Sequence, residues 1–234
     1  TLTMSGASTY AGTTTVSGGI LKAGHVSGFG TGTVVLAGGT LDLDGKAAAN
    51  GVTVSGTAVL NGGSAYAGVL TLDGGTLTGD AVNLAEGKTA QLKSGSIANV
   101  LSGTGGVAKI GDGSSTVTLS GENTYSGKTS VSGGTLKAGH LKAFGESTVE
   151  LSGGTLEMDA LAIANDVQAI GTATLNGGSA YAGVITLDGG TLSGSGINLA
   201  QAMQLKSGTI NNALSGTAGV VKTGAGTVNL TGAI

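Results

Sequence analysis

The sequence TVTLSGENTYSGKTSVSGGTLKAGHLKAFG, at residues 116–145, decides the fold because the chain contains it twice. A close copy, TLTMSGASTYAGTTTVSGGILKAGHVSGFG, occupies residues 1–30, and 19 of the 30 positions are identical. A second stretch, LNGGSAYAGVLTLDGGTLTG at 60–79, returns at 175–194 with only Leu70 and Thr78 replaced. Both pairs have the same sequence offset. A long internal repeat indicates an array of equivalent structural units, so it governs every local interpretation.

The repeat extends over nearly the whole chain, with small deletions that shift it. QLKSGSI at 91–97 matches QLKSGTI at 204–210 at a slightly shorter offset, and TVNLTGAI at 227–234 restarts the opening motif. We therefore expect a first repeat unit at 1–115, a second unit of the same continuous β-helix at 116–226, and the start of a third at 227–234. The sequence reads as a segment of a longer array. We expect targeting and anchoring segments to lie outside it.

Composition narrows the class of protein. Glycine supplies 48 of 234 residues, but there is no proline and no three-residue period, which excludes collagen. Regular Val, Leu and Ile with a net charge of only -3 do not fit the signature of disorder. Ten scattered lysines, no arginine and 3% aromatic residues argue against nucleic acid as a partner. No apolar run is long enough for a membrane helix, so we expect the segment not to be membrane-embedded.

Alternating apolar residues predict short β-strands. TVTL at 116–119 and TLEM at 155–158 place an apolar residue at every second position, which buries one side of a strand and exposes the other. Glycine pairs such as SGG and DGG separate these segments, and glycine forms sharp turns without steric cost. The pattern fits an antiparallel hairpin meander or a solenoid of stacked coils. We favour the solenoid, because near-identical strands that recur after glycine turns can stack on one another.

The expected architecture is an all-β parallel β-helix. Coils of roughly 20–25 residues are typical of such folds, which gives about five coils per unit, about ten in all, and a rod on the order of 50 Å long. Residues 158–168, MDALAIANDVQ, are the one helix candidate, but their counterpart at 43–53 contains two glycines and an asparagine. We expect a loop or a further strand there.

One stretch resembles a known family. GDGSSTVTLSGENTYSGKTSVSGGTLKAG, at 111–139, closely resembles the autotransporter-associated β-strand repeat, also called the passenger-associated transport repeat. The positions that match its pattern are Gly111, Gly113, Leu119, Gly121, Asn123, Thr124, Tyr125, Gly127, Thr129, Val131, Gly134, Thr135, Leu136, Ala138 and Gly139. In the first copy Ser8 replaces Asn123 and Ile20 replaces Thr135. The resemblance covers about thirty residues of each unit directly.

The resemblance implies a passenger domain of a Gram-negative type V secreted protein, folded as a right-handed parallel β-helix. Such a passenger is extracellular, at the bacterial cell surface, either anchored to the outer membrane or secreted, and the full-length protein carries a translocator β-barrel. The implied function is an adhesin stalk or scaffold that supports export, with adhesion or autoaggregation. The implied partners are a host cell surface or matrix, or the same protein on neighbouring cells.

Two other functions stay open. A host-receptor-binding, toxin-like passenger is the main alternative. A polysaccharide-acting enzyme ranks last, because fold analogy is its only support and the chain lacks the basic arginine that polysaccharide lyases commonly use.

Candidate chemical groups favour structural roles. His25 and His140 follow the same Lys-Ala-Gly in each unit, too far apart to share a metal, so we expect a surface or turn role. The carboxylates occupy strand positions that we expect to face solvent: Asp42 and Asp44, Glu157 and Asp159, Asp73 and Asp188. We predict no catalytic, cofactor-binding or metal-binding residue and no cofactor, and the sequence assigns no binding residue.

Tyrosines and asparagines recur at equivalent positions. We expect packing or turn-stabilising roles for Tyr10, Tyr66, Tyr125 and Tyr181. The asparagines are candidates for stacked amide ladders along the rod: Asn61, Asn83, Asn176 and Asn198.

Overall fold

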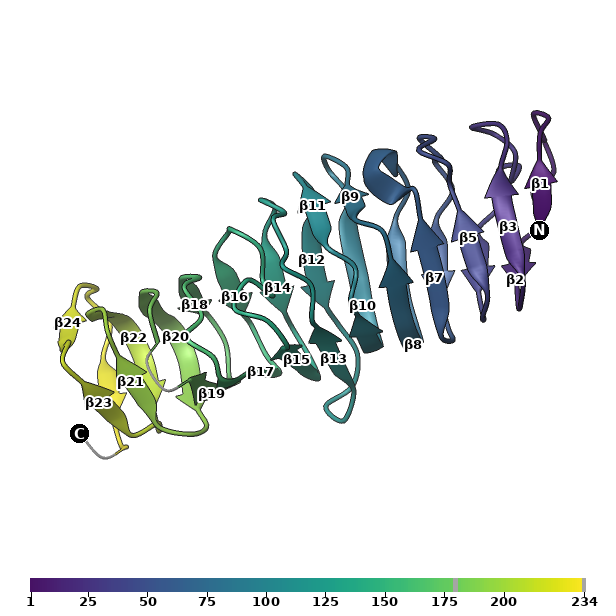
Figure 1. Ribbon diagram of the computed structural model, residues 1–234. Coiled ribbons are helices and arrows are strands. Elements are labelled where there is room, and N and C mark those ends of the chain that lie inside the picture. The colour runs from purple at the N-terminus through teal and green to yellow at the C-terminus, as the bar shows by residue number, and fades with distance from the viewer. Residues whose placement is uncertain (179–180, 233–234) are drawn as a thin grey trace.

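The computed structural model describes residues 1–178 and 181–232. Short strands wind into an elongated solenoid whose two ends are the two ends of the chain (Figure 1). All strand pairs among the described residues are parallel, as between β1 and β3 or β22 and β25. The same residues contain no α-helix and one short 3-10 helix, η1 (Gly63–Ala65). The predicted all-β parallel β-helix is therefore confirmed.

Two long ladders of stacked strands form two sides of the rod. The first ladder contains β1 (Leu2–Met4), β3 (Ile20–Ala23), β5 (Thr40–Asp42), β7 (Ala58–Asn61), β13 (Thr116–Leu119), β15 (Thr135–Ala138), β17 (Thr155–Ala160), β19 (Ala173–Gly178) and β25 (Val228–Leu230). The second ladder contains β2 (Thr14–Val16), β4 (Val34–Leu36), β6 (Val52–Val54), β12 (Gly106–Lys109), β14 (Thr129–Val131), β16 (Val149–Leu151), β18 (Val167–Ala169) and β24 (Val220–Lys222).

Four longer strands belong to both ladders. They are β8 (Leu70–Gly79), β10 (Thr89–Ile97), β20 (Ile185–Ser193) and β22 (Met203–Ile210). Each passes from the second ladder to the first through glycine at positive φ, as at Gly95 (φ 113°) and Gly208 (φ 116°). A Cβ at Gly95 would lie 2.3 Å from the carbonyl oxygen of Gly75 in the preceding coil. Glycine is thus required here both for the backbone conformation and for the close stacking of coils.

The third side of the rod is mostly loop. Only two strand pairs form there, β9 (Val82–Leu84) with β11 (Leu101–Gly103) and β21 (Ile197–Leu199) with β23 (Leu214–Gly216), within the described residues. Buried aromatic side chains lie in these loops, including Phe29 and Phe144.

The coils are slightly shorter than expected, and they vary in length. Thr89 stacks on Gly106 in one of the tighter coils, whereas Gly95 stacks on Val117 in one of the wider ones. The chain therefore forms about 12 turns, close to the expected ten, and 12 strand spacings give a rod of about 58 Å. In the first ladder, β3, β5, β7, β8 and β10 lie between β1 and β13. Equivalent residues of the two copies are therefore six turns apart.

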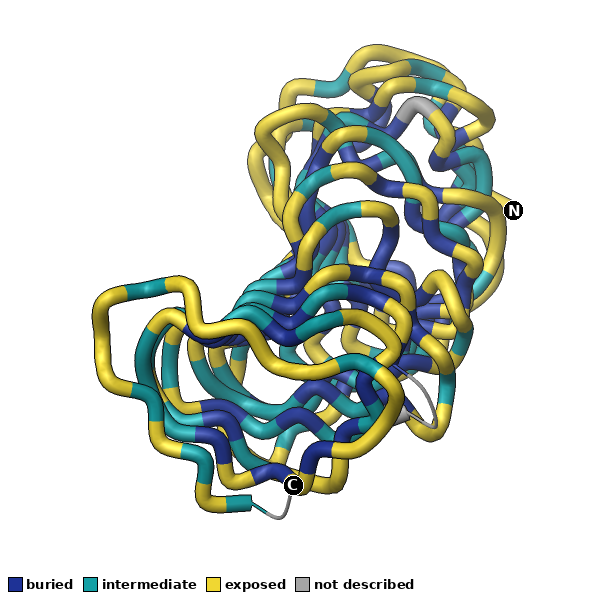
Figure 2. Tube along the Cα trace, turned by 90° about the vertical axis from the view of Figure 1, so that its left-hand side faces the viewer, coloured by how far each residue is buried: buried dark blue, intermediate teal, exposed yellow. Residues whose placement is uncertain are grey.

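The core is a column of inward-facing apolar side chains. In β16, Val149 and Leu151 are fully buried and Glu150 between them faces outward. Figure 2 shows this alternation of buried and partly exposed residues along the stacked strands, with exposed residues at the turns. Each inward side chain packs on its counterpart in the next coil, as Leu136 does on Leu156 and Leu156 on Leu175. The core is therefore continuous along the axis although each coil contributes few residues.

The helix candidate forms no helix. Residues 155–160 are strand β17, which ends with Asp159 and Ala160 at positive φ (47° and 61°), and residues 161–166 are irregular. The expectation of a loop or strand at 158–168 is confirmed.

Candidate interaction surface

The outward side of the first ladder, which we call face 1, has the same chemistry in both copies. Its central row stacks Thr3, Lys22, Asp42 and Asn61 in the first copy and Thr118, Lys137, Glu157 and Asn176 in the second. Lys22 Nζ lies 2.9 Å from Asp44 Oδ1, and Lys137 Nζ lies 2.6 Å from Asp159 Oδ2 at the equivalent site. These exposed pairs join neighbouring coils and contribute little individually.

The outward side of the second ladder, which we call face 2, differs between the copies. Its central row reads Thr15, Val35, Thr53, Thr71 and Gln91 in the first copy. In the second copy it reads Ser130, Glu150, Gln168, Thr186 and Gln204. The inward neighbours barely change, since Val34, Leu36 and Val52 correspond to Val149, Leu151 and Val167. The apolar core was kept while the outer surface of face 2 changed.

The charged groups of face 2 in the second copy pair with one another. Lys128 Nζ lies 2.5 Å from Glu150 Oε2, and Lys206 Nζ lies 2.8 Å from Asp188 Oδ2. Gln168 also donates to Asp188 Oδ2 at 3.3 Å. The hydrogen bond from Lys206 holds the pKa of Asp188 below its usual value, with a smaller contribution from Gln168. In the first copy Thr13 and Val35 stand where Lys128 and Glu150 form their pair.

Two adjoining hollows lie on face 2 of the second copy. One, of about 450 Å³, includes Lys128, Thr148, Glu150 and Gln168. The other, of about 320 Å³, includes Thr148, Gln168, Thr186 and Gln204. Because they share Thr148 and Gln168, they form one groove that crosses several coils along the rod.

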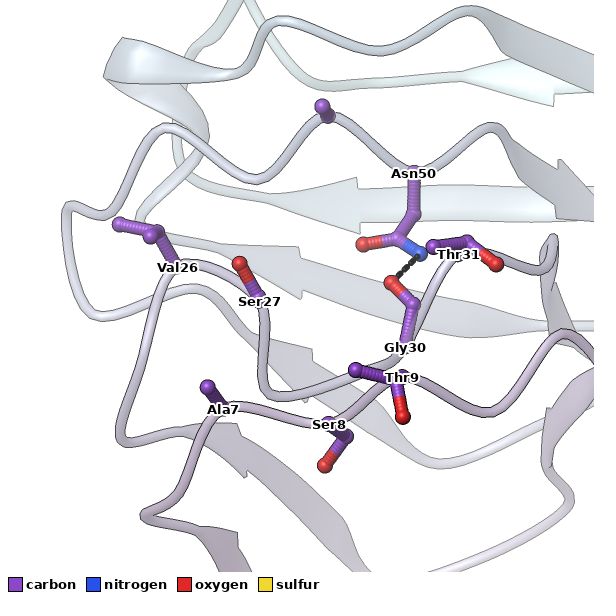
Figure 3. A pocket seen from close by; sticks show the side chains of 9 residues that line it. Ala7, Ser8, Thr9, Val26, Ser27, Gly30, Thr31 and Asn50 are labelled. Carbon is purple, nitrogen blue, oxygen red and sulfur yellow. Dashed lines mark hydrogen bonds between the residues drawn. The ribbon is translucent and has the colours of Figure 1, made fainter.

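A third hollow lies between loops of the first coils, on the third side of the rod. It has a volume of about 470 Å³, and Figure 3 shows Ala7, Ser8, Val26 and Ser27 around it, with the amide of Asn50 directed at the carbonyl of Gly30. In the second copy a longer side chain, Asn123, stands in place of Ser8 and spans the coils. Its Oδ1 accepts from Leu101 N at 2.8 Å and its Nδ2 donates to Ala143 O at 2.6 Å.

The two histidines have the predicted turn role. His25 Nδ1 accepts a hydrogen bond from Ser27 N at 3.0 Å, and His140 Nδ1 accepts one from Lys142 N at 3.1 Å. Each ring therefore caps the turn that follows it. Within residues 1–178 and 181–232, no three His, Asp or Glu side chains lie close enough together to hold a metal ion.

The candidate carboxylates lie on the surface, where several form ion pairs between coils. Asp44 contacts both Lys46 and Lys22, and the hydrogen bond from Lys46, followed by that from Lys22, lowers the pKa of Asp44 to about 2. Asp73 pairs with Lys93 at 2.7 Å, as Asp188 pairs with Lys206 in the second copy. These contacts fix neighbouring coils to each other.

Three of the four tyrosines are packing residues, as expected. Tyr66, Tyr125 and Tyr181 are at most 1% exposed. Tyr66 donates to Asn50 O at 2.7 Å, and Tyr181 donates to Asn165 O at the equivalent site. Burial raises the pKa of all three phenols.

The amide-ladder hypothesis is wrong. Asn61 stacks on Asp42 and Asn176 on Glu157, while the neighbours of Asn83 and Asn198 are serines. The buried asparagines are different ones and lie in loops, where they bond to backbone carbonyls of other coils: Asn50, Asn99, Asn123, Asn165 and Asn212. Their recurrence at equivalent positions, such as Asn50 and Asn165, was the available signal.

Sequence reasoning also missed a buried lysine. Lys109 is inaccessible to solvent, and its Nζ donates to Ile110 O at 2.6 Å, Ser115 Oγ at 2.9 Å and Gly133 O at 3.2 Å. Burial lowers the pKa of Lys109, and Asp112 partly offsets this effect. The ammonium group thus joins the turn after β12 to a turn of the next coil.

No helix in the described part of the chain is long and apolar enough to cross a membrane.

Comparisons with known proteins agree with this architecture. Five segments match the sequence model of the passenger-associated transport repeat: residues 1–23, 55–78, 112–138, 170–193 and 220–233. The matches at 55–78 and 170–193 lie beyond the stretch in which we saw the resemblance. No solved structure matches the chain significantly.

A curated relative is the BmaC autotransporter adhesin of Brucella suis biovar 1 (strain 1330). It is 33% identical over 166 residues, and the match covers 70% of this chain but 4% of the relative. The chain thus spans a small part of the length of that adhesin. Together, the repeated strand motif, the parallel solenoid and these matches show that the chain belongs to the autotransporter passengers built from passenger-associated transport repeats, which lie outside the cell at its surface.

Proposed function

We propose that the chain is the stalk of a surface adhesin and that its repeats support export of the passenger. In this proposal residues 1–115 and 116–226 are two units of one continuous β-helix, and 227–234 begin a third. The full-length protein carries a translocator β-barrel. The rod holds a binding region away from the cell and brings it to a host cell surface, to matrix, or to the same protein on a neighbouring cell.

The observation that carries the proposal is the uninterrupted parallel pairing from β1 to β25. Each strand of the two ladders pairs with strands one coil away, as β14 does with β12 and β16. A finished coil therefore presents an edge on which the next coil can form. A chain that emerges from one end can then fold step by step, and this stepwise folding would draw the passenger outward.

The test is display of the complete chain on a non-adherent bacterium, fused to a translocator barrel. Leu136→Asp buries a carboxylate in the middle of the core column. Lys137→Asp is the control, because it introduces the same carboxylate at the neighbouring, outward-facing position. We expect protease-accessible surface protein for the parent and for Lys137→Asp, and a loss of about tenfold or more for Leu136→Asp because the next coil finds no template. Equal display of all three would refute a role for coil stacking in export.

Attachment and clumping of the same cells separate the stalk from an adhesive role. A stalk gives normal display without attachment to host cells or matrix and without autoaggregation. Attachment of the displayed chain would instead place an adhesive surface on the repeats themselves. Killing or intoxication of host cells by the purified chain would favour the toxin-like alternative.

A further inference from the structure

Face 2 of the second copy combines three properties. It contains the adjoining hollows around Thr148 and Gln168, and three successive residues of its central row, Gln168, Thr186 and Gln204, are polar and uncharged. It also differs from the first copy chiefly at outward positions, where Glu150 and Gln168 stand in place of Val35 and Thr53. A stalk needs only the core and the pairs between coils, so these outward positions are free to take a second role.

The groups along the groove can both donate and accept hydrogen bonds. Gln168 and Gln204 supply amides, and Thr148, Thr186 and Thr223 supply hydroxyls, all partly or fully exposed. Gln168 Nε2 donates to Asp188 Oδ2 at 3.3 Å and Gln204 Nε2 to Ala202 O at 3.4 Å, so each amide offers a ligand its second N–H and its oxygen. An amide offers two donors and an acceptor, and a hydroxyl offers one donor and two acceptors. These are the groups that recognise a ligand rich in hydroxyl groups.

The charges of the groove disfavour the other classes of ligand. Lys128 and Lys206 are outnumbered by three carboxylates, Glu150, Asp166 and Asp188, which leaves an excess of one negative charge. Both lysines are engaged with carboxylates, so a polyanion gains no free cation. An apolar partner would desolvate these groups without replacing their hydrogen bonds.

The repeat of the groove suggests the form of the ligand. Glu150, Gln168, Thr186 and Gln204 follow one another coil by coil, spaced by the strand separation of about 4.8 Å. A sugar unit in an extended, linear polysaccharide has a similar length. Successive units of such a polymer would therefore meet successive coils in the same way.

We propose that face 2 of the second copy binds a neutral, linear polysaccharide that lies along the rod axis. The polymer occupies the groove from Lys128 to Lys206, and the amides of Gln168 and Gln204 bond to hydroxyl groups of successive sugar units. The ion pairs at the two ends, Lys128 with Glu150 and Lys206 with Asp188, hold the lining side chains in place. They do not bind the polymer through its charge. The site rests on the proposed function only in requiring that the passenger be displayed at the cell surface.

The test is binding of the complete chain to neutral hexasaccharides, namely β-1,4-, β-1,3- and α-1,4-linked glucose hexamers, measured by calorimetry or on an array. Gln168→Ala/Gln204→Ala removes the central amides. Thr53→Ala/Gln91→Ala makes the corresponding change in the first copy and serves as the matched control. We expect binding of at least one hexamer, weakened about tenfold or more by the first variant, since two lost hydrogen bonds suffice for that factor. The control should bind as the parent does.

Three results would overturn the proposal: no binding of any hexamer, equal binding by the groove variant, or stronger binding of a sulfated hexamer than of a neutral one. Self-association that depends on Gln168 and Gln204, seen by analytical ultracentrifugation, would identify a second copy as the occupant and would also overturn it. All positions changed are outward-facing, so circular dichroism should show an unchanged fold. Surface display of the same variants distinguishes the stalk proposal from the polysaccharide proposal. Normal display without sugar binding would refute polysaccharide binding and leave the stalk proposal intact.

Discussion

Tyr10 and Tyr125 occupy the same position of the two copies and form the same hydrogen bond, yet only one is buried. Each hydroxyl lies 2.7 Å from a threonine four residues on, Thr14 or Thr129. Tyr10 is 39% exposed, whereas Tyr125 is inaccessible. The difference is the neighbouring coil, because β14 has β12 beneath it and β2 has no described strand on that side. In this fold local sequence sets the conformation and the adjacent coil provides most of the burial.

Truncation of the two tyrosines should show the largest difference. We expect Tyr125→Ala to reduce the free energy of unfolding by about 3–5 kcal/mol, the range for a large aromatic in a core. Tyr10→Ala should cost less than half of that. Urea unfolding followed by circular dichroism, with hydrogen exchange to locate the affected coils, would measure both. Equal losses would show that burial by the adjacent coil is not the source of stability.

Glycines at the turns before β3 and β15 also differ between the copies in what surrounds them. Gly19 and Gly134 have φ of 68° and 65°, so alanine at either site costs about 1–2 kcal/mol for the left-handed backbone. A Cβ at Gly19 meets nothing within 4 Å, but at Gly134 it would lie 2.3 Å from Lys109 Nζ and 2.5 Å from Ser115 O. Gly134→Ala should therefore lose about 1–3 kcal/mol more than Gly19→Ala. Thermal unfolding checks this, and a match between the two variants would contradict it.

Exchange of Asn123 and Ser8 tests the bond to the preceding coil. Asn123→Ser leaves Leu101 N–H and Ala143 C=O without their partner, and we expect a loss of about 1–2 kcal/mol. Ser8→Asn can regain only the contact to the following coil, so its gain should be smaller. Chemical denaturation of the two single variants measures the asymmetry. A gain from Ser8→Asn as large as the loss from Asn123→Ser would rule out the role of Leu101.

The smallest difference concerns pH. The pKa of Asp44 is about 2, below its ordinary 3.8, so the folded state favours the ionised form. Its contribution to stability is present above pH 3.8 and is lost as the pH falls toward 2. Leu161 stands at the position of Lys46 in the second copy. Carbon-detected NMR titration should therefore show the pKa of Asp44 rise in Lys46→Leu, and an unchanged pKa would mean that Lys22 alone is responsible.

The fold was predictable because its two determinants are local. Alternation in TVTL and TLEM defines which side chains enter the core, and glycine pairs define where the chain turns. The predicted number of coils, about ten, is close to the 12 turns of the structure. The exact number depends on turns that differ in length, since the step from Thr89 to Gly106 is shorter than the step from Gly95 to Val117. The number of residues per coil depends on how tightly the glycine-containing turns close. The alternation of apolar and polar residues does not predict this.

The groove on face 2 could not be predicted for the same reason. Ser130 stacks on Glu150 and Glu150 on Gln168, and the second step along the chain is shorter than the first. A fixed number of residues per coil would therefore not have aligned Ser130, Glu150 and Gln168. Lys109 was missed because it occupies an inward position that the pattern assigns to an apolar residue. Three oxygens from surrounding turns satisfy its ammonium group, and turns of irregular backbone cannot be placed by periodicity.

Six whole turns separate β1 from β13, and this has a consequence for how such genes can change length. Recombination between the two copies would insert or remove one entire repeat unit at once. Because that unit corresponds to complete turns, the joined ladders meet strand to strand and their outward sides stay in line. The rod can thus lengthen or shorten by unequal crossing-over without rotating one half of its surface against the other.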